Sequence, residues 1–372
     1  MDFATVVPPY VAKPLELFPF RAVMLAPGRV GDPASARALA RPYRDVAARL
    51  TQWIEQGRAT ADTAPAVYLH EYTSGGLTVR GLVGALGMSR RADSMAERAV
   101  WPHEAIHPEQ AGELADRMFQ MDLNPAPILL VHHGDHELRE LMAEVSHGTP
   151  EWRYLDRTGQ RQRIWAIRDE DVLARIGALL AGARCLLADG HHRYAAYLRL
   201  QQEHPGTAWD SGLAMLVDQD DTPLFLGAIH RTLPGTTLDA LADAARAAGA
   251  AVTGRERHHA LSALDSTHLV LTDGHAWHTV SPRGLDQKAA VAWLHDEVLQ
   301  RLPRPAPRIE HHHNVDDALA ATSPTSPAVL LPSPDFDQVR ALVESGGLLP
   351  EKATSFQPKP SLGVLMRPMN DA

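Results

Sequence analysis

The chain has 372 residues, 45% of them hydrophobic and 22% charged, and its 36 basic and 45 acidic side chains give a formal net charge of −9. This globular composition excludes whole-chain disorder, collagen-like repeats and coiled coil, and the chain can bury a core without structural metals. The acidic balance argues against nucleic acid as a partner. The single cysteine, Cys185, excludes an intramolecular disulfide. With no signal peptide and no apolar run near 18 residues, we expect a cytoplasmic protein.

Hydrophobic spacing and turn residues predict a series of elements in the first 150 residues. They are a strand at 18–26, a helix at 34–56, a hairpin of strands 66–72 and 77–86, a helix at 107–119 and a strand at 127–132.

The remainder of the chain also contains both predicted strands and predicted helices. We expect strands at 163–167, 185–188, 213–217 and 224–230, and helices at 169–180, 191–203, 238–250 and 336–343. The sequence therefore predicts an α+β protein with mixed sheets and flanking helices. Expected regions are 1–150, 151–235 and 236–372, and these could form one integrated domain.

The sharpest motif is ADGHHRY at 188–194, where an apolar strand runs through a turn into a helix. A helix start offers free backbone N–H groups and the positive end of the helix dipole, both of which attract phosphate. Gly190 allows close approach of a ligand, and His191, His192 and Arg193 add donors. The structural alternative is a helix start capped by Asp189, with Arg193 in solvent.

A second motif, YLHEY at 68–72, lies on the first strand of the hairpin. Alternation puts Tyr68, His70 and Tyr72 on one face and Glu71 on the other. Glu71, next to His70, could act as a base or as a metal ligand, or the segment could be an ordinary edge strand. Arg80 on the returning strand could lie opposite.

The segment His103-Glu104-Ala105-Ile106-His107 matches the H-E-x-x-H signature of zinc peptidases. That chemistry needs both histidines one turn apart within a helix. Pro108 disfavours a helical conformation at His107, so the match predicts no zinc site.

Other polar clusters have weaker signatures. His132-His133, His258-His259 and His311–His313 are expected at the surface, the last as an adventitious metal binder. Lys352, with Thr354 and Ser355, could bind phosphate or lie on an exposed strand. GxSxG and Walker A spacings are absent from the sequence.

The ordered motifs resemble the family labelled domain of unknown function 1015 over nearly the whole chain. The resemblance rests on FPFRA (18–22), YLHEY (68–72), RGLVGAL (80–86), PHE (102–104), DR (116–117), ADGHHRYAA (188–196), IHR (229–231) and LPEKATSFQPK (349–359). DGHHRYAA is also similar to the phosphate-binding motif of ParB-like and sulfiredoxin-like domains and of free-serine kinases. That similarity implies a ParB/sulfiredoxin-like core around this segment.

These resemblances imply a nucleotide-dependent phosphotransferase that acts on a small hydroxyl substrate, such as L-serine, with ATP or ADP and Mg²⁺. The implied catalytic residues are His70, Glu71, His103 and Glu104. The implied nucleotide- and phosphate-binding residues are Arg80, Arg117, Asp189, Gly190, His191, His192, Arg193, Arg231, Lys352 and Thr354, with Asp189 also a candidate Mg²⁺ ligand.

Two other functions fit the same residues. A non-catalytic nucleotide-binding regulator would use the phosphate site without needing a base, and a metal-dependent hydrolase would use the many histidines. No membrane partner is expected, and a homodimer is possible.

Overall fold

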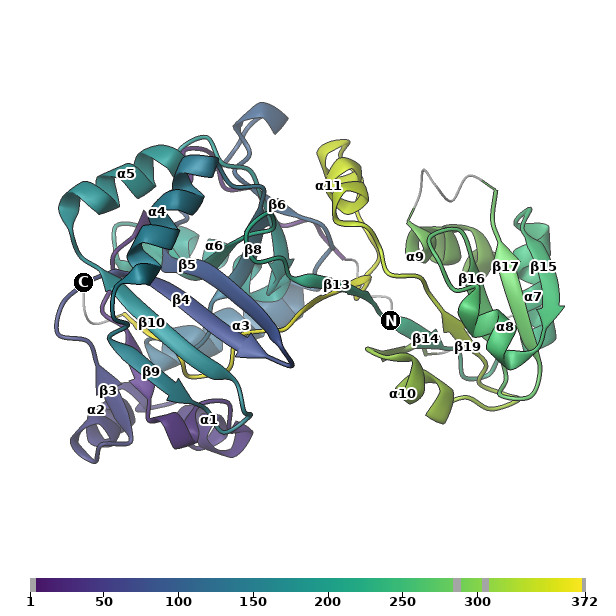
Figure 1. The fold of residues 1–372 in the computed structure, drawn as a ribbon, viewed down its shortest axis with the longest axis horizontal. Helices are drawn as coiled ribbons and strands as arrows, with labels where there is room; N and C mark the ends of the chain where they lie inside the picture. The colour runs from purple at the N-terminus through teal and green to yellow at the C-terminus, as the bar shows by residue number, and fades with distance from the viewer. Residues whose placement is uncertain (1–4, 284–288, 303–307, 370–372) are drawn as a thin grey trace. The chain divides into compact units, whose positions relative to one another are not determined.

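A computed structural model describes residues 5–283, 289–302 and 308–369 and divides into two compact units (Figure 1). The first unit comprises Met1–Leu224 together with Pro358–Ala372, and the second comprises Phe225–Gln357. The chain does not divide near residue 150, which lies between a helix and a strand of the first unit, and the change of unit comes ten residues before 235.

The first unit is built on a nine-stranded mixed sheet of order β6-β11-β8-β12-β5-β4-β10-β9, with β1 paired to β5. Its strands are β1 (Leu17–Phe18), β4 (Val67–Ser74), β5 (Leu77–Gly87), β6 (Val100–Pro102), β8 (Ile128–His132), β9 (Trp152–Leu155), β10 (Arg161–Ile167), β11 (Cys185–Asp189) and β12 (Ser211–Asp218). Two small ladders pair β2 (Val23–Leu25) with β3 (Ala59–Ala61), and β7 (Leu123–Asn124) with β21 (Arg367–Pro368).

Helices flank this sheet. They are α1 (Pro33–Ala40), α2 (Val46–Glu55), α3 (Pro108–Met121), α4 (His136–His147), α5 (Glu170–Leu180) and α6 (His191–Glu203), with short 3-10 turns η1 (Pro27–Arg29), η2 (Met95–Glu97) and η3 (Ala208–Asp210). Helix α6 packs against α3, β8 and β12, while α4 packs against β4, β10 and α5 (Figure 1). The expected α+β class with a mixed sheet and flanking helices is confirmed.

The second unit has its own six-stranded sheet of order β15-β17-β16-β19-β14-β18, and a separate pair, β13 with β20. The strands are β13 (Phe225–Ala228), β14 (His230–Thr232), β15 (Ala251–Arg255), β16 (Leu269–Thr272), β17 (Trp277–Ser281), β18 (Glu310–His312), β19 (Ala328–Leu330) and β20 (Thr354–Gln357). The helices are α7 (Leu238–Ala247), α8 (Arg257–Ser262), α9 (Ala290–Trp293), the π-helical turn η5 (Leu294–Val298), the 3-10 turn η6 (Leu299–Arg301), α10 (Val315–Ala320) and α11 (Phe336–Glu344). Val270, Leu330, Ala318 and Ala260 lie in its core cluster.

Three expected elements differ from the structure, one of them the strand expected at 224–230, which is divided between β13 and β14 in different sheets. The helix expected at 34–56 is interrupted between α1 and α2, because Pro42 cannot donate the backbone hydrogen bond of a helix interior. The strand expected at 18–26 is two short strands that join different ladders, β1 with β5 and β2 with β3. The hairpin is confirmed, since β4 and β5 pair from Tyr68–Val83 to Ser74–Leu77.

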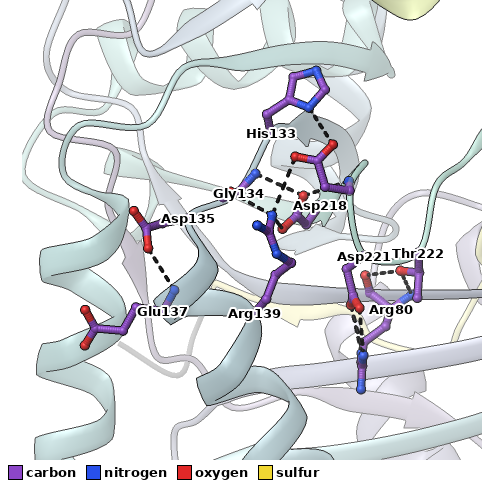
Figure 2. A network of polar contacts seen from close by, with 10 residues as sticks. Arg80, His133, Gly134, Asp135, Glu137, Arg139, Asp218, Asp221 and Thr222 are labelled. Atoms are coloured by element: carbon purple, nitrogen blue, oxygen red, sulfur yellow. Dashed lines mark hydrogen bonds and ion pairs between the residues drawn. The ribbon is translucent and has the colours of Figure 1, made fainter.

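A network of charged side chains fixes the ends of β8 and β12 (Figure 2). The fully buried carboxylate of Asp218 accepts hydrogen bonds from the backbone N–H groups of Gly134 (2.9 Å) and Asp220 (2.9 Å), and from Arg139 (3.0 Å). These three bonds satisfy a charge that would otherwise be costly to bury. They also tie the loop after β8 to the loop after β12.

This network predicts that Gly134→Ala destabilises the protein. An added Cβ would lie 2.1 Å from Asp218 Oδ2, so the carboxylate must leave its donors. We expect unfolding free energy to fall by about 1–3 kcal/mol, measured by denaturant unfolding. Gly177→Ala in α5 is the matched control, because nothing lies within 4 Å of the position that its Cβ would take and alanine favours helix. Equal stability of the two variants would contradict the assignment.

No helix in the described part of the chain is both long enough and apolar enough to span a membrane.

Candidate functional site

Two parallel strands end side by side in the first unit. β6 pairs with β11 through Val100–Cys185, Trp101–Leu186 and Pro102–Leu187. The segments that follow them, His103-Glu104 and Gly190-His191, therefore leave the same edge of the sheet. Ligand sites in sheets with parallel strands lie outside such carboxyl ends. The structure thus brings together the PHE and DGHH motifs, which are far apart in the sequence.

Two pairs of histidines connect these segments. The backbone N–H of His103 donates to His191 Nε2 at 3.4 Å, and the two rings pack edge to face with centroids 4.5 Å apart. The backbone N–H of His107 donates to His192 Nε2 at 3.1 Å. Both acceptor nitrogens must be unprotonated, so each ring carries its proton on Nδ1 when neutral. The H-E-x-x-H histidines therefore belong to a loop that binds the start of α6, since α3 begins only at Pro108.

His103 and Glu104 lie side by side at this edge. His103 is fully buried, and its Nδ1 donates to the carbonyl oxygen of Leu187 at 2.7 Å. Its other nitrogen, Nε2, lies 3.5 Å from Glu104 Oε1. Since Nδ1 donates to a carbonyl, Nε2 is the ring nitrogen that faces the carboxylate. Glu104 is also 12% exposed, so its side chain is accessible to a ligand.

The start of α6 has the form expected of an anion site. Gly190 occupies the cap position at φ 92°, a left-handed conformation that favours glycine. An added Cβ there would lie 3.0 Å from Ile128 Cγ2 and 3.1 Å from Arg193 Nη2. Among the described residues, no side chain caps the first turn. The cap residue is therefore Gly190 and not Asp189, and a helix start of this form presents backbone N–H groups toward an anion.

Asp189 instead binds two cations. Its Oδ2 accepts from Arg193 Nη2 at 2.7 Å, and its Oδ1 forms an ion pair with Lys359. Burial alone would raise the pKa of Asp189, but the charges of Arg193 and Lys359 outweigh it and lower that pKa. Arg193 also donates to the carbonyl oxygens of Ala126 (3.1 Å) and Pro127 (2.6 Å), so it braces the strand end rather than lying free in solvent.

Lys359 is a site residue that the sequence analysis did not select. It comes from the closing segment of the chain, and its side chain is 45% exposed beside Asp189. The signal in the sequence that could have indicated Lys359 was the rarity of lysine, because only four lysines occur among the 36 basic residues.

His70 and Glu71 lie elsewhere on the sheet. Three strands, β8, β12 and β5, separate β4 from β11. The hydroxyl of Tyr72 donates to Pro358 O at 2.7 Å, so the Tyr72 face is the one toward the Lys359 segment. Glu71 points to the opposite face, where it forms an ion pair with Arg163. His70 Nε2 is hydrogen-bonded to Gln162 Oε1 at 2.8 Å in the core.

The remaining candidates of the first unit, Arg80 and Arg117, bind other partners. Arg80 is opposite Glu71 in register, as expected, but its guanidinium binds Asp221 (Figure 2). The guanidinium also donates to the hydroxyl of Ser146 at 2.9 Å. Arg117 is exposed on α3 and pairs with Glu113 at 2.9 Å. Arg231, Lys352 and Thr354 belong to the second unit.

The described histidines and carboxylates offer little support for a metal centre at this edge. Among described residues, one group could place three ligand atoms within 4.8 Å of one another, and it is the exposed Glu256, His258 and His259 of the second unit. Cys185 is buried in β11, and burial raises the pKa of its thiol, as expected for an inert core cysteine.

Comparison with known proteins places the chain in a family. Residues 19–303 match the family described as protein of unknown function (DUF1015). No curated protein matches the sequence.

Several solved structures are similar at low identity. C-terminally truncated SbnI from Staphylococcus aureus has 12% identity and a TM-score of 0.44, over 77% of this chain and 88% of that one. A mutant free serine kinase in complex with AMP has 14% identity and a TM-score of 0.42, over 77% and 92%. A conserved hypothetical protein from Pyrococcus furiosus has 16% identity and a TM-score of 0.39, over 74% and 94%.

The buried histidines predict acid destabilisation. Burial lowers the pKa of His70 from 6.5 to about 4, although its bond to Gln162 raises it, and burial with the neighbouring His103 lowers that of His191 to about 3. The folded protein keeps both rings neutral, whereas the unfolded chain takes up protons below about pH 6.5. The unfolding free energy should therefore fall between pH 6.5 and 4, by at most about 1.4 kcal/mol per pH unit for each histidine.

Denaturant unfolding at a series of pH values measures the slope of the unfolding free energy against pH. His70→Gln keeps a donor toward Gln162 but removes one titrating group, so its slope should be shallower than that of the wild type. An identical slope would show that His70 titrates normally in the folded protein.

Proposed function

The chain belongs to the DUF1015 family, and we propose that it is a nucleotide-dependent phosphotransferase acting on a small hydroxyl substrate such as L-serine. The observation that carries the proposal is the parallel pairing of β6 with β11, which sets the Glu104 carboxylate beside an uncapped, glycine-led helix start. Phosphoryl transfer needs little beyond such positioning and the neutralisation of charge. The similarity of DGHHRYAA to the motif of free-serine kinases supports the same reaction.

The start of α6 would hold the phosphates of ATP or ADP. Its first-turn N–H groups and the positive end of the helix dipole favour an anion, and Gly190 leaves room for close approach. Lys359 adds a partly exposed positive charge at the same edge, while Arg193 holds Asp189 and the helix start in place. His191 stays neutral because burial lowers its pKa to about 3, so it acts as a fixed hydrogen-bonding group.

Glu104 would be the general base. The substrate hydroxyl gives its proton to the Glu104 carboxylate, beside which His103 Nε2 lies at 3.5 Å. The hydroxyl oxygen forms a bond to the terminal phosphorus of the nucleotide, and the bond from that phosphorus to the bridging oxygen breaks. The shortened nucleotide leaves with the electron pair, and the negative charge that develops is stabilised by the α6 N–H groups and Lys359.

The Asp189 donor set does not fit Mg²⁺ in this arrangement. Its carboxylate is the hard oxygen donor that Mg²⁺ prefers, but one oxygen is bound to Arg193 and the other to Lys359. No step of the proposed reaction therefore runs through a metal ion held by Asp189.

A related proposal concerns the fold. We infer that β6, β11 and α6 form the centre of a ParB/sulfiredoxin-like core, on the strength of the motif similarity and the strand–turn–helix geometry. The position of sulfiredoxin's cysteine is occupied by His191, so sulfinic-acid repair is not proposed.

The proposal predicts that Glu104→Gln loses transfer but keeps nucleotide binding. Removal of a general base typically costs roughly 100-fold or more in rate. The wild-type protein, incubated with Mg²⁺, ATP or ADP and a panel of hydroxyl amino acids and small alcohols, should give a new phosphomonoester signal in phosphorus NMR. The Glu104→Gln variant should give almost none, with unchanged broadening of the nucleotide signals.

Glu109→Gln is the matched control, since Glu109 is exposed in the first turn of α3, five residues along the same segment. Nucleotide binding with no turnover in the wild type would favour the regulatory alternative. Full activity of Glu104→Gln would overturn the assignment of the base, and Glu71→Gln would then be the next variant to assay.

A further inference from the structure

The segment that carries Lys359 is fixed along its backbone by side chains of the sheet. The hydroxyl of Tyr72 donates to Pro358 O at 2.7 Å, and Gln160 Nε2 donates to Lys359 O at 3.0 Å. A proline follows Lys359 and restricts its backbone to an extended conformation. The two carbonyl groups at this point of the chain are therefore held from β4 and from the turn between β9 and β10.

A directional chain of hydrogen bonds lies behind Gln160. The carboxylate of Asp156 can only accept, so Gln162 Nε2, at 2.8 Å from Asp156 Oδ2, is the donor there. Gln162 Oε1 must then accept from His70 Nε2, at 2.8 Å. Gln162 Nε2 also donates to Gln160 Oε1 at 3.2 Å, which leaves Gln160 Nε2 as the donor to Lys359 O. One carboxylate thus fixes the orientation of both amides.

The turn that contains Asp156 is itself well ordered. Asp156 is buried, and its Oδ1 accepts from the N–H (2.8 Å) and hydroxyl (2.8 Å) of Thr158 and from the N–H of Gln160 (3.0 Å). Burial alone would raise the pKa of Asp156, but its hydrogen bonds outweigh burial and lower that pKa. The hydroxyl of Ser361 donates to Gln160 Oε1 at 3.1 Å, so Gln160 contacts the closing segment at two residues.

This arrangement gives the YLHEY motif a position in the site. Gln162 is opposite Tyr72 in the β4–β10 register, so both side chains lie on one face of the sheet, the face that also carries His70. Tyr72 reaches the closing segment directly, and His70 reaches it through the two glutamines.

We propose that Gln160 is a positioning residue for Lys359, and that it holds the backbone from which the ammonium group reaches Asp189 at the start of α6. The use of that ammonium group for a phosphate rests on the function proposed above. A lysine side chain is a flexible four-carbon stem, so its charge is directed only if its backbone is fixed. A backbone that is ordered in advance also lowers the entropy lost when a ligand binds.

Nitrogen NMR of the lysine ammonium groups tests the positioning without a nucleotide. An ammonium group held by a carboxylate exchanges its protons more slowly than a free one, because the charge-assisted bond is strong. The chain has four lysines, and Lys359→Gln identifies the signal. Gln160→Met keeps the side-chain length but removes the donor, so the Lys359 signal should broaden or vanish. Tyr72→Phe, which loses only a hydroxyl, should change it in the same direction.

Gln219→Met is the matched control for Gln160→Met. The amide of Gln219 also clamps backbone in the first unit, since it donates to Leu224 O at 2.8 Å and accepts from Leu224 N at 3.2 Å. The Lys359 signal should be unchanged in this variant.

ADP affinity, measured by titration calorimetry, tests what the positioning does. Lys359→Gln should raise the dissociation constant about tenfold, the effect of losing one charge-assisted hydrogen bond. Gln160→Met should raise it roughly threefold, and should have no further effect when Lys359 is already glutamine, because residues that act through one another are not additive. A general loss of stability would not produce this dependence.

An unchanged Lys359 signal in Gln160→Met, or the same change in Gln219→Met, would overturn the proposal, as would additive effects on ADP affinity. If the signal is lost in Gln160→Met and the wild type binds no ADP, the positioning of Lys359 is supported while the function proposed for the first unit fails.

Discussion

The candidate site depends on one short piece of parallel pairing, between β6 and β11. Three residue pairs hold these strands together, and the segments that follow the two strands leave the sheet at the same edge. The contacts that follow, from His103 to His191 and from His107 to His192, use backbone N–H groups of one segment and side chains of the other. The loop after β6 is thereby fixed to the first turn of α6. Without that pairing, the segments that contain Glu104 and Gly190 would not be held at the same edge of the sheet.

Local sequence signals predicted much of the fold. The hairpin register follows from alternation and the Gly75-Gly76 turn, and α6 occupies 191–203 as its pattern indicates. Pro108 correctly predicted that His107 does not lie inside a helix, since α3 begins only at Pro108. In each case the determining interactions lie within a few residues, so the sequence contains them directly.

The sequence could not rank the two glutamates or identify Lys359. Glu71 and Glu104 both sit beside a histidine, and their difference lies in strand order: β6 is next to β11, whereas three strands separate β4 from it. Strand order is a property of long-range packing, which no local pattern encodes. The role of Asp189 was missed for a related reason, because its partner Lys359 comes from the distant end of the chain. His311 looked like a surface residue until the register placed it opposite Arg231.

The second unit is inserted into the first, and this has a consequence for how the protein is made. The first unit is completed by residues after Pro358: Arg367 and Pro368 pair with β7, Met366 bonds to Val23, and Lys359 reaches Asp189. During synthesis the nine-stranded sheet emerges from the ribosome long before these last residues do. The second unit, whose residues are contiguous in the chain, can fold before the first is finished. The candidate site therefore acquires its lysine after the whole second unit has been made, and a nascent chain cannot carry the complete constellation before Lys359 is added.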